Sequence, residues 1–406
     1  MFLTELIKLS EAKRILNENQ IILDGEIVDL KDSYLRVLKD NIYSKHDSPP
    51  FDKSAMDGYA VIAEDTFTSS PNNVKTLKII DRIGAGNYSE KTIKKGEAIK
   101  VATGSPVPKG GSAVLMEEYT ISNGENLEIH GAVTPSENIA PQGEDIKTGE
   151  KILEKNTILR PQEMGLIASG GYGKVEVYKK PLVKLIVTGN ELVEPGSTLK
   201  KAEVINSNKF TITGMLKSLG LDVEIDHSHD EVQELKEKIL DSINEYDIII
   251  TTGGTAISKG DIVVDVIEDI GEVLFHGVAI RPGKPFGFGV VNKTPVFMLS
   301  GYPVAAMGQF DALVREYLLK MQNITFNPKK HKRISNLKIP SNLGRTDFVR
   351  AYSTDKSVEH ALNKGSGIIK SMVEANSYLI IDENKEGIEK GETVEIIYFE
   401  SLNLNK

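Results

Sequence analysis

The chain of 406 residues contains no cysteine and no tryptophan. The absence of cysteine excludes disulfides, thiol nucleophiles and thiolate metal sites. No apolar run approaches the ~20 residues that a membrane-spanning helix needs, and the first residues show no basic segment followed by an apolar core. We therefore expect a cytoplasmic protein with no signal peptide and no membrane partner.

Positive charge is also scarce. The 58 acidic residues exceed the 49 basic ones, which leaves a net charge of -9. This balance argues against nucleic acid as a partner, so an anionic ligand would have to meet a local cluster of cations. The seven histidines show no metal-ligand spacing, and His227 and His229 alternate as residues on one face of a strand would.

A chain of 406 residues is too long for one ordinary hydrophobic core, so we expect several domains. The pattern of apolar, glycine and proline residues also changes along the chain. Leucine and isoleucine at Leu6, Leu9, Ile15 and Leu16, and again at Leu35 and Leu38, predict two helical segments within 1–45. Short alternating runs with many glycines and prolines predict a β domain over 46–145. A mixed stretch with a helix over 161–170 follows, and β-like runs return after residue 327.

Between 181 and 326 apolar strands alternate with amphipathic helices. The expected strands are 182–187, 222–225, 247–250 and 273–275, and the expected helices are 206–219, 230–243 and one that begins near Asp261. This alternation predicts a doubly wound, mostly parallel sheet with helices on both faces. Ligands of such sheets bind at the loops that leave the carboxyl ends of the strands.

Four loops meet this description. They are Thr188-Gly189-Asn190-Glu191, Thr251-Thr252-Gly253-Gly254 continuing to Ser258 and Asp261, Arg281-Pro282-Gly283-Lys284-Pro285, and Ser300-Gly301-Tyr302-Pro303. Glycines let backbone N–H groups approach an anion, and two cations between prolines suit the same task. A purely structural turn remains open for the Gly-Gly loop. None of the loops matches a P-loop or a dinucleotide fingerprint.

The stretch Ser48-Pro49-Pro50-Phe51-Asp52-Lys53-Ser54-Ala55-Met56-Asp57-Gly58-Tyr59-Ala60 combines a diproline with an Asp-Gly turn. The prolines forbid a helix, and Asp57-Gly58 predicts a turn before a strand. Asp57 could act only as a turn former. The stretch around Asp57 is followed, in this order, by Ala102-Thr103-Gly104, Gly143-Glu144-Asp145 and the four loops. Together these motifs resemble the molybdopterin molybdenumtransferase family of MoeA type, which includes the C-terminal module of gephyrin.

The resemblance covers nearly the whole chain and implies a fold of four domains in a homodimer. A discontinuous dimerisation domain would comprise 1–45 and 146–180, with a β domain inserted at 46–145. An α/β molybdopterin-binding domain would comprise 181–326, and a small β-barrel 327–406. The multidomain α/β fold class is thus a doubly wound domain with an inserted β domain, a mixed domain and a C-terminal barrel.

The resemblance also implies a reaction, in which adenylylated molybdopterin and molybdate or tungstate give molybdenum cofactor and AMP in the presence of Mg²⁺. The catalytic residues would be Asp57, Thr103, Asp145, Glu191, Asp230 and Lys284. The substrate-binding residues would be Thr252, Gly253, Gly254, Ser258, Arg281, Pro303, Arg350 and Ser366. Glu191 and Asp261 would bind the metal, with Asp230 as a further candidate, and Asp57, Thr103 and Asp145 would complete the cleft of the other subunit. The upstream adenylyltransferase is a further expected partner.

Several alternatives stay open. Asp230 stands where a helix N-cap is expected, and Ser366 could be a turn residue. Ser300, Tyr302 and Asn190 depart from the family's usual proline, asparagine and aspartate. Two other functions are a non-catalytic molybdopterin carrier or scaffold, and a nucleotide pyrophosphatase related through the α/β domain.

Overall fold

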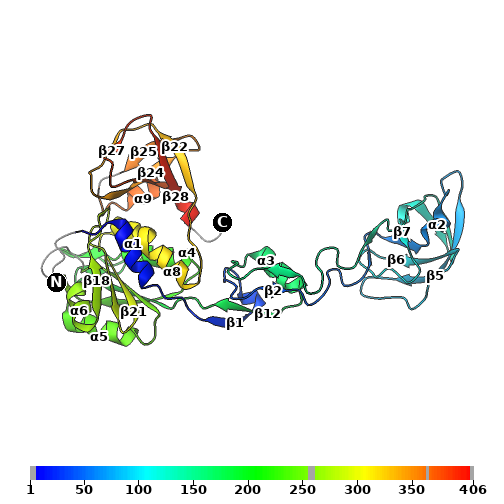
Figure 1. Cartoon of the computed structure of the whole chain (residues 1–406), viewed down its shortest axis with the longest axis horizontal. Helices are drawn as coiled ribbons and strands as arrows, with labels where there is room; N and C mark the ends of the chain where they lie inside the picture. Colours follow the sequence, from blue (N-terminus) through cyan, green and yellow to red (C-terminus); the bar gives the residue numbers. More distant parts are fainter. Residues whose placement is uncertain (1–5, 255–260, 363–364, 403–406) are drawn as a thin grey trace. The chain divides into compact units, whose positions relative to one another are not determined.

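The computed structural model describes residues 6–254, 261–362 and 365–402. The chain folds into two compact units (Figure 1). The β unit comprises residues 27–34 and 38–176, and the α/β unit comprises residues 1–26, 35–37 and 177–406. The predicted Ser258 lies outside the described residues.

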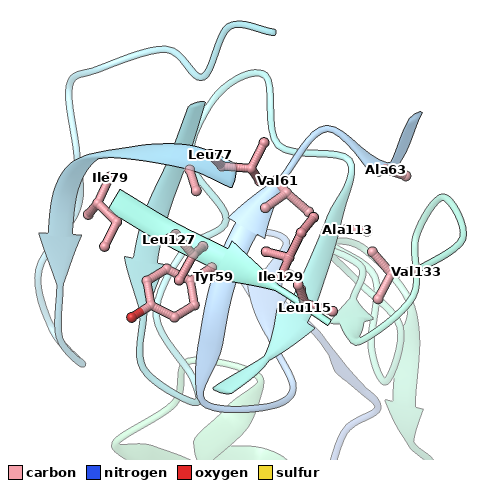
Figure 2. Close-up of a cluster of buried hydrophobic side chains, with 11 residues drawn as sticks. Tyr59, Val61, Ala63, Leu77, Ile79, Ala113, Leu115, Leu127, Ile129 and Val133 are labelled. Atoms are coloured by element: carbon pink, nitrogen blue, oxygen red, sulfur yellow. The ribbon is translucent and has the colours of Figure 1, made fainter. Parts of the chain in front are cut away.

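The β unit is organised around a six-stranded sheet with the order β7-β4-β6-β5-β9-β8. Its strands are β4 (Gly58–Val61), β5 (Lys75–Ile83), β6 (Glu97–Val101), β7 (Ala113–Met116), β8 (Thr120–Asn123) and β9 (Asn126–Ile129). All pairs are antiparallel except β5 with β6. One face buries Tyr59, Leu115 and Leu127 in an apolar cluster (Figure 2), and each fully buried side chain of this size contributes about 2 kcal/mol.

The rest of the β unit consists of short elements. They are β2 (Ile42–Tyr43), β3 (Lys53–Ser54), β10 (Ile139–Ala140), β11 (Lys151–Leu153), α2 (Ala63–Thr66), α3 (Pro161–Ser169) and the 3-10 turns η1 (Leu30–Asp32) and η2 (Glu117–Tyr119). The paired strands β1 (Gly25–Asp29) and β12 (Lys174–Tyr178) contain residues of both units. Proline at the first position of α3 begins that helix without losing a hydrogen bond, as the sequence predicted.

The second helical segment predicted before residue 45 is wrong. Leu35 has a φ of 58°, in the left-handed region, which ends any right-handed helix at that residue. The backbone then runs extended, and Leu38 N donates to Thr157 O at 3.0 Å. Leu35 and Leu38 are buried, so their spacing reflects packing and not a helical face.

The α/β unit contains a six-stranded sheet with the order β16-β13-β17-β21-β20-β18. Its strands are β13 (Val183–Thr188), β16 (Val223–Ser228), β17 (Ile248–Thr252), β18 (Glu272–His276), β20 (Gly287–Val291) and β21 (Thr294–Leu299), and the small ladder β14 (Leu192–Val193) with β15 (Val204–Ile205) stands beside it. The first four strands in this order are parallel, and β20 and β18 extend the sheet in antiparallel fashion. The predicted mostly parallel sheet is confirmed.

Helices cover both faces of this sheet (Figure 1). The helices are α1 (Leu9–Glu18), α4 (Asn208–Ser218), α5 (Val232–Ser242), α6 (Ile262–Ile270), α7 (Pro303–Gln309), the π-helical turn η3 (Phe310–Val314) and α8 (Arg315–Met321). Met298 of β21 packs into the cluster formed with α5 and α6, whereas its neighbour Phe297 contacts Tyr317 of α8. This alternation is the period of two expected of a strand buried on both faces.

The C-terminal part closes into a five-stranded barrel, β24-β25-β22-β28-β26, because β26 pairs back onto β24. Its elements are β22 (Lys330–Ser335), β24 (Thr346–Ser353), β25 (Ser357–Leu362), β26 (Ser377–Ile381), β28 (Thr393–Tyr398), the ladder β23 (Ile339–Pro340) with β27 (Gly387–Ile388), α9 (Lys370–Glu374) and η4 (Phe399–Leu402). A two-residue strand from the α/β region, β19 (Ile280–Arg281), adds to β24 in parallel. The predicted barrel is confirmed, whereas the four domain boundaries stay a prediction.

Candidate functional site

A cleft of about 1020 Å³ lies where β13, β17 and β21 end. Its walls include Thr188, Glu191, Asp230, Gly253, Gly254 and Pro303. The strands carry these residues to one edge because they run in parallel and their carboxyl ends coincide. The structure thus brings together six residues from separate loops, five of which the sequence placed in the site.

One wall of the cleft is acidic. Gly189 has a φ of 147°, and a Cβ there would lie 2.8 Å from Glu191 Oε2, so only glycine lets the carboxylate fold back over the turn. Asn190 N donates to Asp230 Oδ2 at 3.3 Å, and Asp230 N donates to Asn190 Oδ1 at 3.1 Å. This reciprocal pair fixes the Asp230 loop against the Glu191 loop, and both carboxylates line the cleft.

The structure does not place Asp230 at a helix N-cap. The N-cap of α5 is Glu231, and the Asp230 carboxylate bonds to Asn190. His227, which the sequence left without a role, holds the same wall, because its Nε2 lies 3.0 Å from Gly189 O. No sequence signal distinguished His227 from an ordinary strand histidine.

Another part of the cleft wall is a glycine turn that lies against Thr188. Gly253 and Gly254 have φ values of 92° and 60°, and a Cβ on Gly253 would lie 2.4 Å from Thr188 O. The hydroxyls of Thr188 and Thr252 are buried and have no hydrogen-bond partner among the described residues. Buried hydroxyls of this kind call for a partner, and a polar ligand in the cleft would supply one.

Asp261 stands behind this turn. Its Oδ1 accepts from Val264 N at 3.2 Å and caps α6, and the residue is buried. Its Oδ2 lies 3.3 Å from His276 Nε2, and burial lowers the pKa of His276, so this contact is with a neutral imidazole. In the described part of the chain Asp261 does not line the cleft, although the adjacent Ile262 does.

A second cavity, of about 390 Å³, adjoins the cleft and is lined by cations. Arg281, Lys284, Arg345 and Arg350 all line it, together with Ser366. Burial lowers the pKa of Arg350 and of Arg281, and both remain charged at neutral pH because a guanidinium starts far above it. This concentration of positive charge suits an oxyanion.

Asp347, which the sequence did not single out, holds two of these cations. It is fully buried and pairs with Arg281, with Arg345 Nε at 3.0 Å and with Ser341 Oγ at 2.6 Å. Arg350 Nη1 donates to Gly365 O at 3.1 Å. Arg281 reaches this cluster because β19 pairs with β24, with Arg281 opposite Asp347.

Two turns separate the cleft from the cation cavity, and Gln309 joins them. Its Nε2 donates to Gly283 O at 2.8 Å, and its Oε1 accepts from Ser300 N at 2.8 Å. Ser300, Tyr302 and Pro285 line both cavities. Gln309 is fully buried in the otherwise apolar α7, and a lone amide in an apolar stretch is the one trace of this role in the sequence.

In the β unit, Asp57 and Thr103 lie together. Thr103 N donates to Asp57 Oδ1 at 2.8 Å, and Asp57 lines a basin of about 240 Å³ with Arg82, Lys100 and Glu117. Asp145 lies on a different turn, where its N–H donates to Ser48 O at 2.9 Å, and its side chain does not line this basin. The predicted shared cleft between subunits stays a prediction.

Residues 6–254, 261–362 and 365–402 hold no group of three or more His, Cys, Asp or Glu side chains placed to bind a metal ion. Nor does any helix within them have the length and apolar character needed to cross a bilayer.

Comparisons with known proteins place the chain in a family. Residues 7–171 match "MoeA N-terminal region (domain I and II)", residues 184–320 match "Probable molybdopterin binding domain", and residues 333–399 match "MoeA C-terminal region (domain IV)". A molybdopterin biosynthesis protein of Methanocaldococcus jannaschii is 38% identical over 97% of this chain and 96% of its own length. A molybdopterin molybdenumtransferase of Staphylococcus aureus is 32% identical over the same shares.

Solved structures agree with the sequence matches. The crystal structure of a molybdopterin biosynthesis MoeA protein from Pyrococcus horikoshii superposes with a TM-score of 0.79 at 36% identity, covering 97% of this chain and all of that one. Another crystal structure of a molybdopterin biosynthesis MoeA protein from that organism gives a TM-score of 0.83 at 32% identity, covering 97% of this chain and 99% of that one. With relatives this similar over nearly its full length, the chain belongs to the MoeA family of molybdopterin molybdenumtransferases, which are transferases.

Proposed function

We propose that the protein inserts molybdate or tungstate into adenylylated molybdopterin and releases AMP, as a step of molybdenum cofactor biosynthesis. The observation that carries the proposal is the junction of two cavities of opposite character. One has carboxylates and a glycine turn, the other has four cations, and Ser300, Tyr302 and Pro285 line both. A pterin nucleotide in the first and an oxyanion in the second would meet at this junction.

The residues have matching tasks. Gly253 and Gly254, with the Thr252 hydroxyl, would receive the phosphates, because their backbone comes close without side chains. Pro303 begins α7 beside them. Arg281, Lys284, Arg350 and Ser366 would hold the oxyanion, since fixed guanidinium groups match oxyanion geometry and the lysine adds a mobile charge.

The cleft also fits a magnesium ion. Mg²⁺ is held by one or two carboxylates together with waters and substrate phosphates, and Glu191 and Asp230 line the same cleft. Asp261 fits less well, because one oxygen caps α6 and the carboxylate is buried. A bound Mg²⁺ would supply Lewis acidity at the phosphoanhydride. The protein's own part is to hold the phosphate chain between the acidic wall and the glycine turn.

The test of the reaction is AMP release. Purified protein with adenylylated molybdopterin, Mg²⁺ and either oxyanion should release AMP above a no-protein control and transfer the metal to the pterin. If the pterin nucleotide binds but no AMP appears with molybdate or tungstate, the transferase proposal is wrong and the carrier alternative gains. AMP release that does not depend on an oxyanion would instead favour the pyrophosphatase alternative.

We further propose a homodimer in which Asp57, Thr103 and Asp145 of one copy complete the cleft of the other. Support comes from Asp57, which lines a basin of the β unit with Arg82 and Lys100 and whose carboxylate is held by Thr103 N. Asp57→Ala and Lys284→Ala proteins should each be inactive, yet mixed dimers should regain activity. Random exchange makes about half of the dimers mixed, so roughly a quarter of the clefts would be intact.

The control for this experiment is native mass spectrometry, which shows whether subunits have exchanged. Proven exchange without recovered activity would mean that each cleft is built within one chain. The cytoplasmic location and the contact with an upstream adenylyltransferase stay predictions.

A further inference from the structure

Tyr302 occupies the junction of the two cavities and is open to both. It lines the 1020 Å³ cleft and the 390 Å³ cation cavity, and 63% of its surface is exposed. Among the cleft-lining residues that the structure describes, it is the one aromatic. The ring thus presents an aromatic surface at the meeting point of two ligand-sized cavities.

The backbone around this ring is held firmly. Tyr302 N donates to Ser300 Oγ at 3.3 Å, and Tyr302 O accepts from Ala306 N at 2.9 Å in the first turn of α7. Val304 N donates to Ser366 O at 3.0 Å, which ties the same turn to the barrel loop. The backbone that carries the ring is therefore held in place by hydrogen bonds on both sides of Tyr302.

The barrel loop lies close to one edge of the ring. A Cβ built on Gly367 would lie 3.4 Å from Tyr302 Cδ1 and 3.8 Å from Tyr302 Cε1, which is ordinary contact distance. Ile369, 38% exposed, lines the same cleft. The other walls near it are the glycine turns and small apolar side chains such as Leu192 and Val204, which offer no aromatic surface.

We propose that Tyr302 is a specificity-determining residue whose ring stacks on a planar nitrogen heterocycle of the substrate. This inference rests on the proposed function, whose pterin nucleotide carries two such heterocycles, the pterin and the adenine. Stacking places one heterocycle at the junction, with its phosphates toward the glycine turn.

The test measures binding of each heterocycle without turnover. Titration calorimetry of the full chain with 6-hydroxymethylpterin and, separately, with AMP gives the affinity of each ring. Tyr302→Ala should weaken one of the two ligands about tenfold, the size expected of lost ring stacking, and the ligand that is affected identifies the ring. Tyr302→Phe should keep the affinity within about twofold, because it keeps the face that stacks.

The matched control is Tyr352→Ala. Tyr352 is 46% exposed in the same unit and lines neither cavity, so its loss should leave both affinities unchanged. The proposal would be overturned if Tyr302→Ala bound both ligands as tightly as the wild type does. It would also be overturned if Tyr302→Phe weakened binding as much as Tyr302→Ala, or if the wild type bound neither ligand. Because the experiment measures affinity and not turnover, its result can be interpreted even if the protein fails to catalyse the transferase reaction.

Discussion

The cleft and the cation cavity adjoin each other, yet they are built by different means. The cleft depends on backbone shape, because Gly189, Gly253 and Gly254 have positive φ and because the backbone at Thr188 leaves no room for a Cβ on Gly253. The cation cavity depends on charge, because buried Asp347 pairs with Arg281 and Arg345. We therefore expect the cleft to tolerate changes of charge better than changes of side-chain volume. The cation cavity should tolerate changes of volume better than changes of charge.

Removing the buried acid should give the largest effect. Asp347→Ala leaves two guanidinium groups without their carboxylate, and loss of one partner from a buried cluster costs about 3–4 kcal/mol. Urea unfolding should show this loss. The control Asp355→Ala removes a fully exposed carboxylate 3.9 Å from Arg333, and its stability should be unchanged. If the two variants had equal free energies of unfolding, the cation cavity would not depend on the charge of Asp347.

Removing a cation from the same cavity should affect turnover and not folding. Lys284→Ala should lower turnover on the order of 100-fold, about 3 kcal/mol in the barrier, because an exposed charge aimed at an oxyanion is lost. The melting temperature should stay constant. Lys338→Ala, which removes an exposed lysine paired with Glu389, is the control and should retain full turnover. Undiminished AMP release by Lys284→Ala would contradict the assignment.

A single methyl group should damage the cleft. Gly253→Ala places a Cβ 2.4 Å from Thr188 O at positive φ, and we expect a loss of about 2 kcal/mol in the free energy of unfolding. Gly344→Ala has a similar φ of 81° and open space, so it isolates the backbone strain of about 1 kcal/mol. Denaturant unfolding of both proteins separates the two terms. If both variants lose the same free energy of unfolding, the short distance between position 253 and Thr188 O does not contribute to the loss.

The smallest effect concerns Asp261. As an N-cap it should lose about 1 kcal/mol of stability on Asp261→Ala and almost none on Asp261→Asn, because asparagine caps equally well. Thermal unfolding and AMP release distinguish this role from metal binding. Strongly reduced turnover of Asp261→Asn at an unchanged melting temperature would show that the carboxylate charge is needed in the cleft.

Much of the fold could be predicted from the sequence, because the buried strands are continuous apolar runs. The stretch 182–187 corresponds to β13 and the stretch 247–250 to β17, with shifts of one or two residues. The helix predicted around Leu35 and Leu38 failed, because one leucine with positive φ ends a helix and no local pattern announces it. Such a conformation is imposed by tertiary contacts.

The site divides in the same way. Glu191, Gly253, Arg281 and Lys284 stand in loops that the strand pattern itself locates. Asp347 and Gln309 could not be found in that way, since each acts through partners distant in the chain: Asp347 pairs with Arg281, and Gln309 bonds to Gly283. A polar residue within a strand or a helix does not reveal from the sequence alone which partner it will meet.

The pairing of β19 with β24 has a consequence for protein engineering. Ile280 and Arg281 belong to the α/β region by sequence, but their ladder partners, Thr346 and Asp347, belong to the barrel. A chimera that exchanges the barrel between relatives at residue 327 would therefore transplant the carboxylate and leave its arginine behind. Recombination of these modules would succeed only when the Arg-Pro-Gly-Lys-Pro segment is inherited with the barrel it pairs with.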